Sequence, residues 1–358
     1  MKWVYFCFWA LLNIYISTNI YVLLQHLIYP GDDASECTTT LCGNLGQIFK
    51  LKQKYRHMKV LLCIGGWEFS SHLATAILHP ANRENFANSV ITLIKDYGFD
   101  GVEIDWEYAE TINQARQFVE LLKVVREKID NFSEEMNLEE GQIELTVAGP
   151  AGPVQYSRMR LGQMDDYVTF WNLMGYDFSG PWVSKVAYQS NLYHGELSTD
   201  SAVKAYLAAG IPSTKIVVGM PAYGRLFLGT SGVGDHFTST GPGTRFGGIY
   251  DYKYLNSEKD RVDPYQICAF HYNQTLSTFM SFDNPLVTEA KAMYVVENNL
   301  GGGMFWEVST DAHINSPRSL IRKFTDTIGF KRFKNCNLLD YPESKFTNVR
   351  NAAFFADE

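Results

Sequence analysis

Residues 98–108 of the chain read GFDGVEIDWEY, in which three carboxylates alternate with apolar side chains. A run with glycines and a β-branched core, placed between two helix-like segments, predicts a buried parallel strand. Because strand side chains alternate between faces, Glu103, Asp105 and Glu107 should point to one side. Same-face neighbours lie roughly 6–7 Å apart, so each negative charge should raise the pKa of the next carboxyl group. We therefore expect one carboxyl to stay protonated, as general acid catalysis requires.

The segment DGVEIDWEY resembles the DGxDxDxE signature on the fourth strand of glycoside hydrolase family 18, which contains chitinases and non-catalytic lectins. This resemblance implies that Glu107 is the catalytic acid and that Asp105 orients the acetamido group of the sugar. It also implies that Tyr108 is a tyrosine of the substrate cleft. Glu103 departs from the pattern, which has Asp at that position.

Four further segments resemble motifs of the same family, and they follow in the family's order. Residues 63–67, CIGGW, resemble the SxGG motif of the third strand, with Cys63 in place of the serine. Residues 172–182, NLMGYDFSGPW, resemble the MxYDxxG motif of the sixth strand. Residues 219–225, GMPAYGR, resemble the GxPxYGR motif of the seventh, and residues 301–306, GGGMFW, end the eighth. The resemblance thereby adds Tyr176 and Asp177 to the catalytic residues, and to the substrate-binding residues Gly65, Gly66, Trp67, Met174, Tyr223, Arg225 and Trp306.

Strands that alternate with helix-like segments, such as residues 82–97, predict an α/β fold. Functional residues at strand ends are typical of a TIM (β/α)8 barrel. Residues 226–285 are rich in Gly, Ser, Thr and Tyr and are too long for a simple loop. The resemblance implies a small α+β insertion there, between the seventh and eighth strands. We therefore expect a catalytic barrel from residues 1–225 and 286–330, and a C-terminal tail from residues 331–358.

The first 24 residues are strongly apolar and allow two interpretations. One is a targeting segment, although only Lys2 precedes the apolar run and no small-residue cleavage site follows it. Polar residues interrupt the run short of a membrane-spanning helix. The other interpretation, from the family pattern extended backwards, is the second barrel strand and its hairpin, with the first strand missing. We favour the strand and keep the targeting segment open.

The composition excludes several classes of function. The 31 basic and 39 acidic residues give a net charge of −8, which provides no basic surface for nucleic acid. The eight histidines show no ligand spacing and the six cysteines no CxxC pair, so we expect no metal and no cofactor. Cys37 and Cys42 could form a local disulfide. Cys63, inside an apolar run, is expected to be a buried thiol.

The resemblance implies a substrate-assisted mechanism. Since Asp105 and Glu107 share one strand face, Asp105 cannot easily attack the opposite face of the sugar, which disfavours retention by two opposed carboxylates. The 2-acetamido carbonyl would attack the anomeric carbon instead. Asp105 would bind the acetamido N–H and Tyr176 its oxygen, while Trp306 would support the distorted ring.

The expected function is therefore a chitinase that hydrolyses β-1,4 linkages of N-acetylglucosamine polymers. Two alternatives remain open: an endo-β-N-acetylglucosaminidase acting on glycans and a non-catalytic chitin-binding lectin on the same fold. The expected partner is chitin or a chito-oligosaccharide. We expect a monomer without a stable membrane span, secreted or associated with the cell wall.

Overall fold

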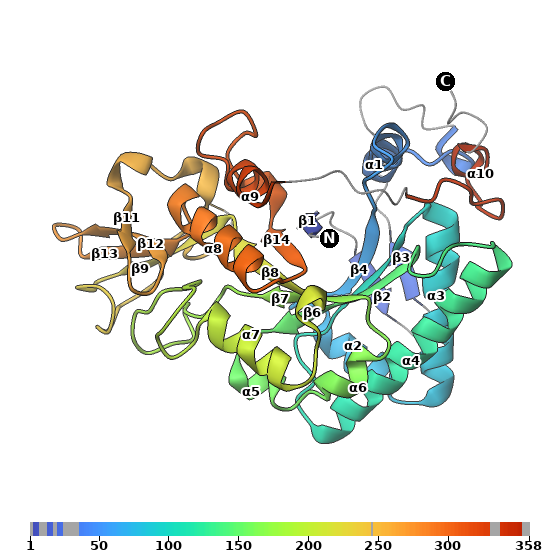
Figure 1. Ribbon diagram of the computed structural model, residues 1–358, viewed down its shortest axis with the longest axis horizontal. Helices are drawn as coiled ribbons and strands as arrows, with labels where there is room; N and C mark the ends of the chain where they lie inside the picture. The colour runs from blue at the N-terminus through green and yellow to red at the C-terminus, as the bar shows by residue number, and fades with distance from the viewer. Residues whose placement is uncertain are drawn as a thin grey trace. The chain divides into compact units, whose positions relative to one another are not determined.

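The computed structural model describes residues 3–6, 13–16, 20–23, 36–244, 246–329 and 337–352 (Figure 1). The chain divides into two compact units. Unit 1 consists of residues 1–9, 149–157 and 170–330, and unit 2 of residues 10–148, 158–169 and 331–358.

Unit 2 is built on parallel strands. β4 (Leu61–Gly65) pairs with β5 (Gly101–Asp105), and β5 pairs with the first residues of β6 (Glu144–Pro150). A separate antiparallel hairpin is formed by β2 (Asn13–Ile16) and β3 (Ile20–Leu23). The helices of the unit are η1 (Glu36–Thr38), α1 (Gly43–Lys54), α2 (Ser70–Ala76), α3 (Pro80–Tyr97), α4 (Ile112–Glu135), α6 (Leu161–Asp165) and α10 (Thr347–Arg350).

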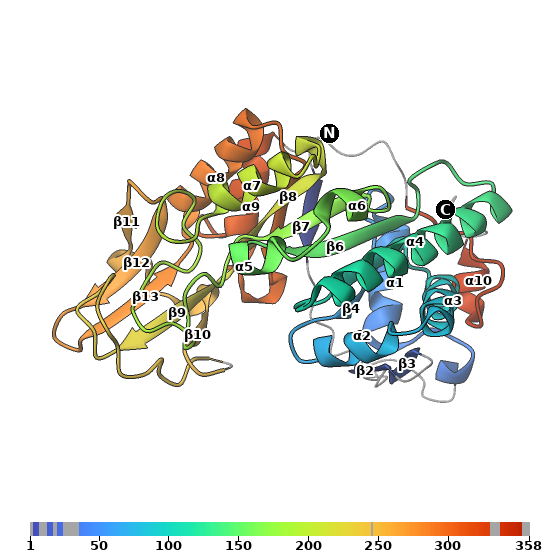
Figure 2. The ribbon, with the colours of Figure 1, turned by 90° about the horizontal axis from the view of Figure 1, so that it is seen from below.

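The helices α3 and α4 pack against each other (Figure 2), and local sequence sets where each begins or ends. α3 starts with Pro80, whose fixed φ suits the first helical turn. It ends at Gly98, which adopts a left-handed φ of 70° and donates its N–H to the carbonyl of Ile94. At the start of α4, Thr111 and Gln114 form a reciprocal capping box. Each helix buries a stripe of apolar side chains.

A buried ion pair anchors the beginning of β5. The Nζ atom of Lys52 lies 2.9 Å from Oδ2 of Asp100, and both side chains are almost fully inaccessible to solvent. Burial lowers the pKa of Lys52 to about 8, against the opposing effect of Asp100. Lys52 also donates to the hydroxyl of Tyr341 at 3.0 Å, and Asp100 accepts from the N–H of Leu338 at 2.8 Å. The C-terminal segment 337–352 is thereby fastened to the strand that carries the carboxylates.

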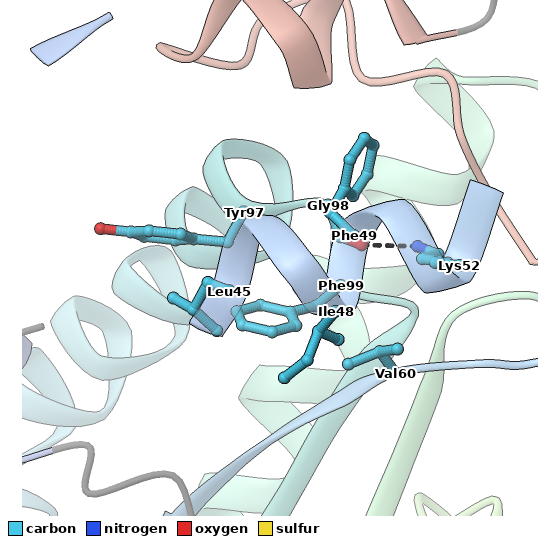
Figure 3. Close-up of a pocket in the computed structure, with 8 residues that line it drawn as sticks. All are labelled: Leu45, Ile48, Phe49, Lys52, Val60, Tyr97, Gly98 and Phe99. Carbon is cyan, nitrogen blue, oxygen red and sulfur yellow. Dashed lines mark hydrogen bonds between the residues drawn. The ribbon is translucent and has the colours of Figure 1, made fainter. Parts of the chain in front are cut away.

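A small hollow lies beside this ion pair, between α1, the end of α3 and the chain entering β5 (Figure 3). Lys52 crosses it to donate a hydrogen bond to the carbonyl oxygen of Gly98. Its lining is otherwise mostly apolar and comprises Leu45, Ile48, Phe49, Lys52, Val60, Tyr97, Gly98 and Phe99. The hollow therefore belongs to the packing around the pair and contains none of the predicted site residues.

Unit 1 contains a second set of parallel strands. β7 (Phe170–Met174) pairs with β8 (Ile216–Pro221), β8 with β14 (Gly302–Trp306), and β14 with β1 (Trp3–Phe6). The strand predicted near the N-terminus is confirmed for β1, which pairs with β14, the strand that was expected to be eighth. A short apolar run carries no information about which sheet edge it joins.

Unit 1 also contains an antiparallel sheet of five strands, in the order β10 (Ile249–Asp251), β9 (Tyr223–Leu228), β13 (Thr278–Phe282), β12 (Cys268–Asn273) and β11 (Arg261–Asp263) (Figures 1 and 2). Its helices are α5 (Pro153–Tyr156), α7 (Thr199–Ala208), η2 (Ser213–Lys215), η3 (Tyr252–Tyr254), η4 (Ser257–Lys259), α8 (Pro285–Glu297), η5 (Val308–Thr310) and α9 (Leu320–Ile328). Most of the antiparallel sheet falls within the expected insertion 226–285. The division into barrel, insertion and tail stays a prediction.

Parts of the sequence-based expectations lie outside the described residues. These are residues 331–336 and 353–358 of the expected tail, and the portions of the first 24 residues that do not belong to β1, β2 or β3. Of the helices in the described ranges, none has both the length and the apolar character needed to cross a membrane.

Candidate active site

The carboxylates of unit 2 lie at the end of β5. Glu103 and Asp105 belong to the strand and are each 7% exposed, while Glu107 follows two residues later and is partly exposed. Burial raises the pKa of Asp105 well above its usual value, and the negative charges of Glu107 and Glu103 raise it further. The expectation that neighbouring charges raise the pKa of a carboxyl in this set holds for Asp105, although burial is the larger cause.

Asp105 has a second property that bears on ligand binding. Its Oδ1 atom is buried and has no hydrogen-bond partner among the described residues. An unpartnered polar atom in a protein interior is costly, since it has lost its bonds to water. An N–H donor brought by a ligand would remove that cost.

Two glycines allow the ends of β4 and β5 to approach closely. Gly65 pairs with Asp105 in the parallel register, and a Cβ atom at Gly65 would overlap the carbonyl oxygen of Asp105. Gly65 also has a φ of 123° and Gly66 a φ of 85°, which side chains rarely permit. The N–H of Gly66 donates to the Asp105 carbonyl at 2.8 Å. Trp67 follows directly, with 74% of its surface exposed.

The two cysteine predictions have opposite outcomes. The disulfide between Cys37 and Cys42 is confirmed. Cys63, expected to be a buried thiol, is exposed, so that prediction is wrong. Its neighbours Leu62 and Ile64 are buried on one face of β4, and alternation places Cys63 on the other face, the same as Glu103 with which it pairs. An apolar run alone does not distinguish a strand buried on one face from one buried on both.

In unit 1, Asp177 accepts two hydrogen bonds from the motif at the start of β9. The hydroxyl of Tyr223 donates to its Oδ1 at 2.6 Å, and Nε of Arg225 donates to the same atom at 2.7 Å. Burial acts to lower the pKa of Arg225, but the contact with Asp177 outweighs it and the pKa is raised. Arg225 therefore remains a buried cation. Asp177 has a φ of 59°, a conformation that Asp tolerates better than most residues.

Trp182 was not among the predicted site residues. Its ring lies over the guanidinium of Arg225, with 4.6 Å between the ring centroid and Cζ, yet the side chain is 59% exposed. The cation and the ring attract each other and hold the indole in place. Trp182 is the last residue of the segment 172–182, so its position in that motif could have marked it as a candidate. Its partner, however, is 43 residues away along the chain.

Tyr176 and Trp306 pack on a small apolar cluster formed by Phe170, Val217 and Met304. The hydroxyl of Tyr176 lies 3.9 Å from the sulfur of Met304. Each side chain remains partly exposed while it packs on these apolar residues. Such rings can stack on the apolar face of a sugar.

The predicted site residues thus form two groups, each described within its own unit. In unit 2, Gly65 and Gly66 adjoin the carboxylates of 103–107, with Trp67 and the partly exposed Tyr108 next in sequence. In unit 1, the described group comprises Met174, Tyr176, Asp177, Tyr223, Arg225 and Trp306, of which Met174 is buried at the end of β7. Across the ranges that the structure describes, no three His, Cys, Asp or Glu side chains are grouped so that they could hold a metal ion.

Known proteins resemble the chain over most of its length. The family described as glycosyl hydrolases family 18 matches residues 4–311. Endochitinase 1 of Metarhizium robertsii is 38% identical over 331 residues, which cover 90% of this chain and 77% of that protein. Chitinase 1 of Aphanocladium album is 36% identical with the same coverage. The solved structure of chitinase ChiA74 from Bacillus thuringiensis matches with a TM-score of 0.80 and 25% identity, and the match covers 89% of this chain and 59% of that one.

Proposed function

Because the chain belongs to the glycosyl hydrolases of family 18 and is a glycoside hydrolase of the chitinase type, we propose that it cleaves β-1,4 linkages of chitin by substrate-assisted retention. The predicted TIM-barrel class of its fold is confirmed by the similarity to solved chitinases of the same family. The observation that carries the proposed mechanism is the buried, unpartnered Oδ1 of Asp105 next to two further carboxyl groups.

Asp105 and Glu107 divide the work on the reacting sugar. The acetamido N–H donates to the unpartnered oxygen of Asp105, which turns the acetamido carbonyl toward the anomeric carbon. That carbonyl oxygen forms a bond to the anomeric carbon as the glycosidic C–O bond breaks. Glu107 gives its proton to the leaving oxygen, and a cyclic oxazolinium ion results. Water then attacks the anomeric carbon, and the bond from that carbon to the oxazolinium oxygen breaks, which regenerates the acetamido group. Glu107, now a carboxylate, takes the water's proton and returns to its starting state.

We assign supporting roles to the residues of unit 1 from the family pattern. The hydroxyl of Tyr176 binds the acetamido oxygen, and the ring of Trp306 lies under the distorted sugar. Their packing on the Met304 cluster, together with their partial exposure, supports these roles. Asp177, which is partly exposed, joins this group through its bonds to Tyr223 and the buried Arg225.

The same-face arrangement disfavours the common retaining mechanism. That mechanism needs a second carboxylate on the opposite side of the sugar ring, about 5 Å from the acid. The carboxylates of unit 2 instead follow one another along a single strand and its exit. The substrate therefore has to supply its own nucleophile.

Substrate choice and domain organisation complete the proposal. The barrel comprises residues 1–225 and 286–330, and the insertion 226–285 forms one wall of a chitin-binding groove, with residues 331–358 as a tail. A monomer that is secreted or associated with the cell wall suits a polymeric substrate that is found outside the cell. The presence of Glu107 argues against a lectin without activity.

The decisive experiment uses partly deacetylated chitosan. Only an N-acetylated sugar has the carbonyl oxygen that attacks, so the new reducing ends should be almost exclusively N-acetylglucosamine with the β configuration at first release. Fully deacetylated chitosan should be inert. Mass-spectrometric sequencing that finds frequent glucosamine at the new ends, or an initial α product by NMR, would exclude substrate assistance. Release from a high-mannose glycopeptide but not from chitin oligomers would instead identify an endo-β-N-acetylglucosaminidase.

A further inference from the structure

Ser70, the first residue of α2, connects the catalytic strand to the exit of β4. It is buried, with 3% of its surface exposed. The hydroxyl oxygen accepts a hydrogen bond of 2.7 Å from the backbone N–H of Glu107. The same hydroxyl donates to the carbonyl oxygen of Gly66 at 2.9 Å. One hydroxyl group thus bridges the peptide that carries Glu107 and the glycine turn that follows β4.

This bridge completes a small ring of hydrogen bonds next to the carboxylates. Gly66 accepts from Ser70 and donates its own N–H to the carbonyl of Asp105 at 2.8 Å. Asp105 and Glu107 are therefore tied to the same turn, one directly and one through Ser70. The distance between the two carboxyl groups depends on both connections.

The bond from Ser70 acts where the β-sheet no longer holds the chain. The paired register between β4 and β5 ends at Gly65 and Asp105, and that between β5 and β6 ends at Ile104 and Val147. Glu107 lies two residues beyond the last paired residue of β5. Its backbone position thus depends on contacts other than the strand ladder, and the Ser70 hydroxyl supplies one of them.

Ser70 is not explained as a helix cap. A serine at a helix start ordinarily accepts from an N–H two or three residues later in its own helix. The N-cap of α2 is Phe69, no side-chain capping bond is present, and the Ser70 hydroxyl instead accepts from a residue 37 positions away. Its hydrogen bonding serves the segment around Glu107 and not the start of α2.

We propose that Ser70 is a positioning residue: its hydroxyl holds the backbone of the acid, Glu107, at a fixed place relative to Asp105. This proposal rests on the proposed function of Glu107. A catalytic group displaced by about 1 Å can cost roughly 10²-fold in rate. Without the Ser70 bond, the Glu107 peptide loses a contact with the turn that also holds Asp105, so the separation of the two carboxyl groups is no longer fixed.

The test compares Ser70→Ala with a matched control, Ser344→Ala. Ser344 is fully buried in unit 2 and makes the same pair of bonds, donating to the carbonyl of Asp96 at 2.7 Å and accepting from the N–H of Phe346 at 3.1 Å. Both variants lose one buried hydroxyl, so both should lose similar stability. Only Ser70→Ala should lower kcat on chito-oligosaccharides, by about 10- to 100-fold, with KM changed less than about threefold.

The pH profile separates positioning from a general loss of structure. The negative charge of Glu107 is one of the causes that raise the pKa of Asp105. If Glu107 moves away in Ser70→Ala, the acidic limb of the kcat profile should move to lower pH. The limb should not move in Ser344→Ala. Rates are expressed per folded molecule, from the native fraction in a thermal melt.

The outcomes distinguish this inference from the proposed function. If the wild-type protein cleaves chito-oligosaccharides and Glu107→Gln does not, the acid assignment stands. Ser70→Ala with the kcat and pH profile of Ser344→Ala then overturns the positioning role alone. Wild-type turnover in Glu107→Gln instead overturns the acid assignment and, with it, this proposal. Should Ser70→Ala not fold, Ser70→Cys fills the same space with a weak donor and acceptor, and unchanged kinetics there would equally refute the inference.

Discussion

Asp100→Asn removes the negative partner of a lysine that has no access to water. Lys52 and Asp100 are 1% and 0% exposed, with 2.9 Å between Nζ and Oδ2. Removing one member of a buried ion pair costs about 3–5 kcal/mol, because the other group is left buried without its counterion and must stay charged there or release its proton. For a unit of this size each kcal/mol lowers Tm by about 2–4 °C. We therefore expect Tm to fall by about 6–20 °C at pH 7.

The size of this loss should depend on pH. Burial already lowers the pKa of Lys52 to about 8 from its ordinary value of 10.5. Without Asp100 the folded protein holds Lys52 neutral, whereas the unfolded chain binds its proton up to about pH 10. Between the pKa of Lys52 in the folded variant and its pKa in the unfolded chain, the unfolded state binds more protons than the folded state. The free energy of unfolding of the variant therefore rises with pH in this range. Above the Lys52 pKa of about 8 the wild-type protein gains stability with pH as well, so raising the pH from 7 to 9 should recover about 1.4 kcal/mol of the loss, the value of one pH unit.

Thermal melts followed by circular dichroism at pH 7 and pH 9 measure both effects. Glu84→Gln is the control, because its ion pair with Lys128 is half-exposed and worth at most about 1 kcal/mol. A fall in Tm no larger than that of Glu84→Gln would refute the stabilising role of the pair. An equal fall at both pH values would mean that Lys52 remains charged after the substitution.

Three predictions concern the catalytic residues. Glu107→Gln keeps the shape of the side chain but not the transferable proton, so product release from chito-oligosaccharides should fall by about 10² or more. Calorimetry should show that binding is retained, and near wild-type turnover would contradict the acid role. Glu103→Ala removes one cause of the raised pKa of Asp105, so the acidic limb of the pH-rate profile should shift to lower pH, and an identical profile would show that Glu103 is electrostatically idle. Trp306→Ala should weaken both binding and rate because the stacking surface is lost, and unchanged kinetics would place Trp306 outside the site.

The alternation of 98–108 was sufficient to predict a buried strand with its carboxylates on one face, because side-chain direction in a strand follows from its period alone. Glu103 and Asp105 lie in β5 and are buried as expected. The raised pKa of one carboxyl also followed from charge spacing. That this carboxyl is Asp105 depends on its complete burial, which is a property of the packed unit.

A single segment of sequence did not predict which face of a strand is exposed or which strand lies beside it. Cys63 is flanked by the buried Leu62 and Ile64 but is itself exposed. Likewise β1 is a strand as predicted, but its pairing with β14 could not be predicted from the short apolar segment itself. Hydrophobicity along the chain indicates how a segment folds locally, but not which neighbour it meets.

By itself, then, the sequence determined the kinds of elements, the order of the motifs and the family to which the chain belongs. These depend on short-range periodicity and on residue identities at fixed spacing. Only the tertiary structure decided that Ser70 bonds to Glu107 and that the ring of Trp182 lies over Arg225. It also decided that the segment 337–352 bonds to Lys52 and Asp100. Each of these contacts joins residues far apart along the chain, and the free energy that selects them comes from burial and hydrogen bonding in the assembled unit.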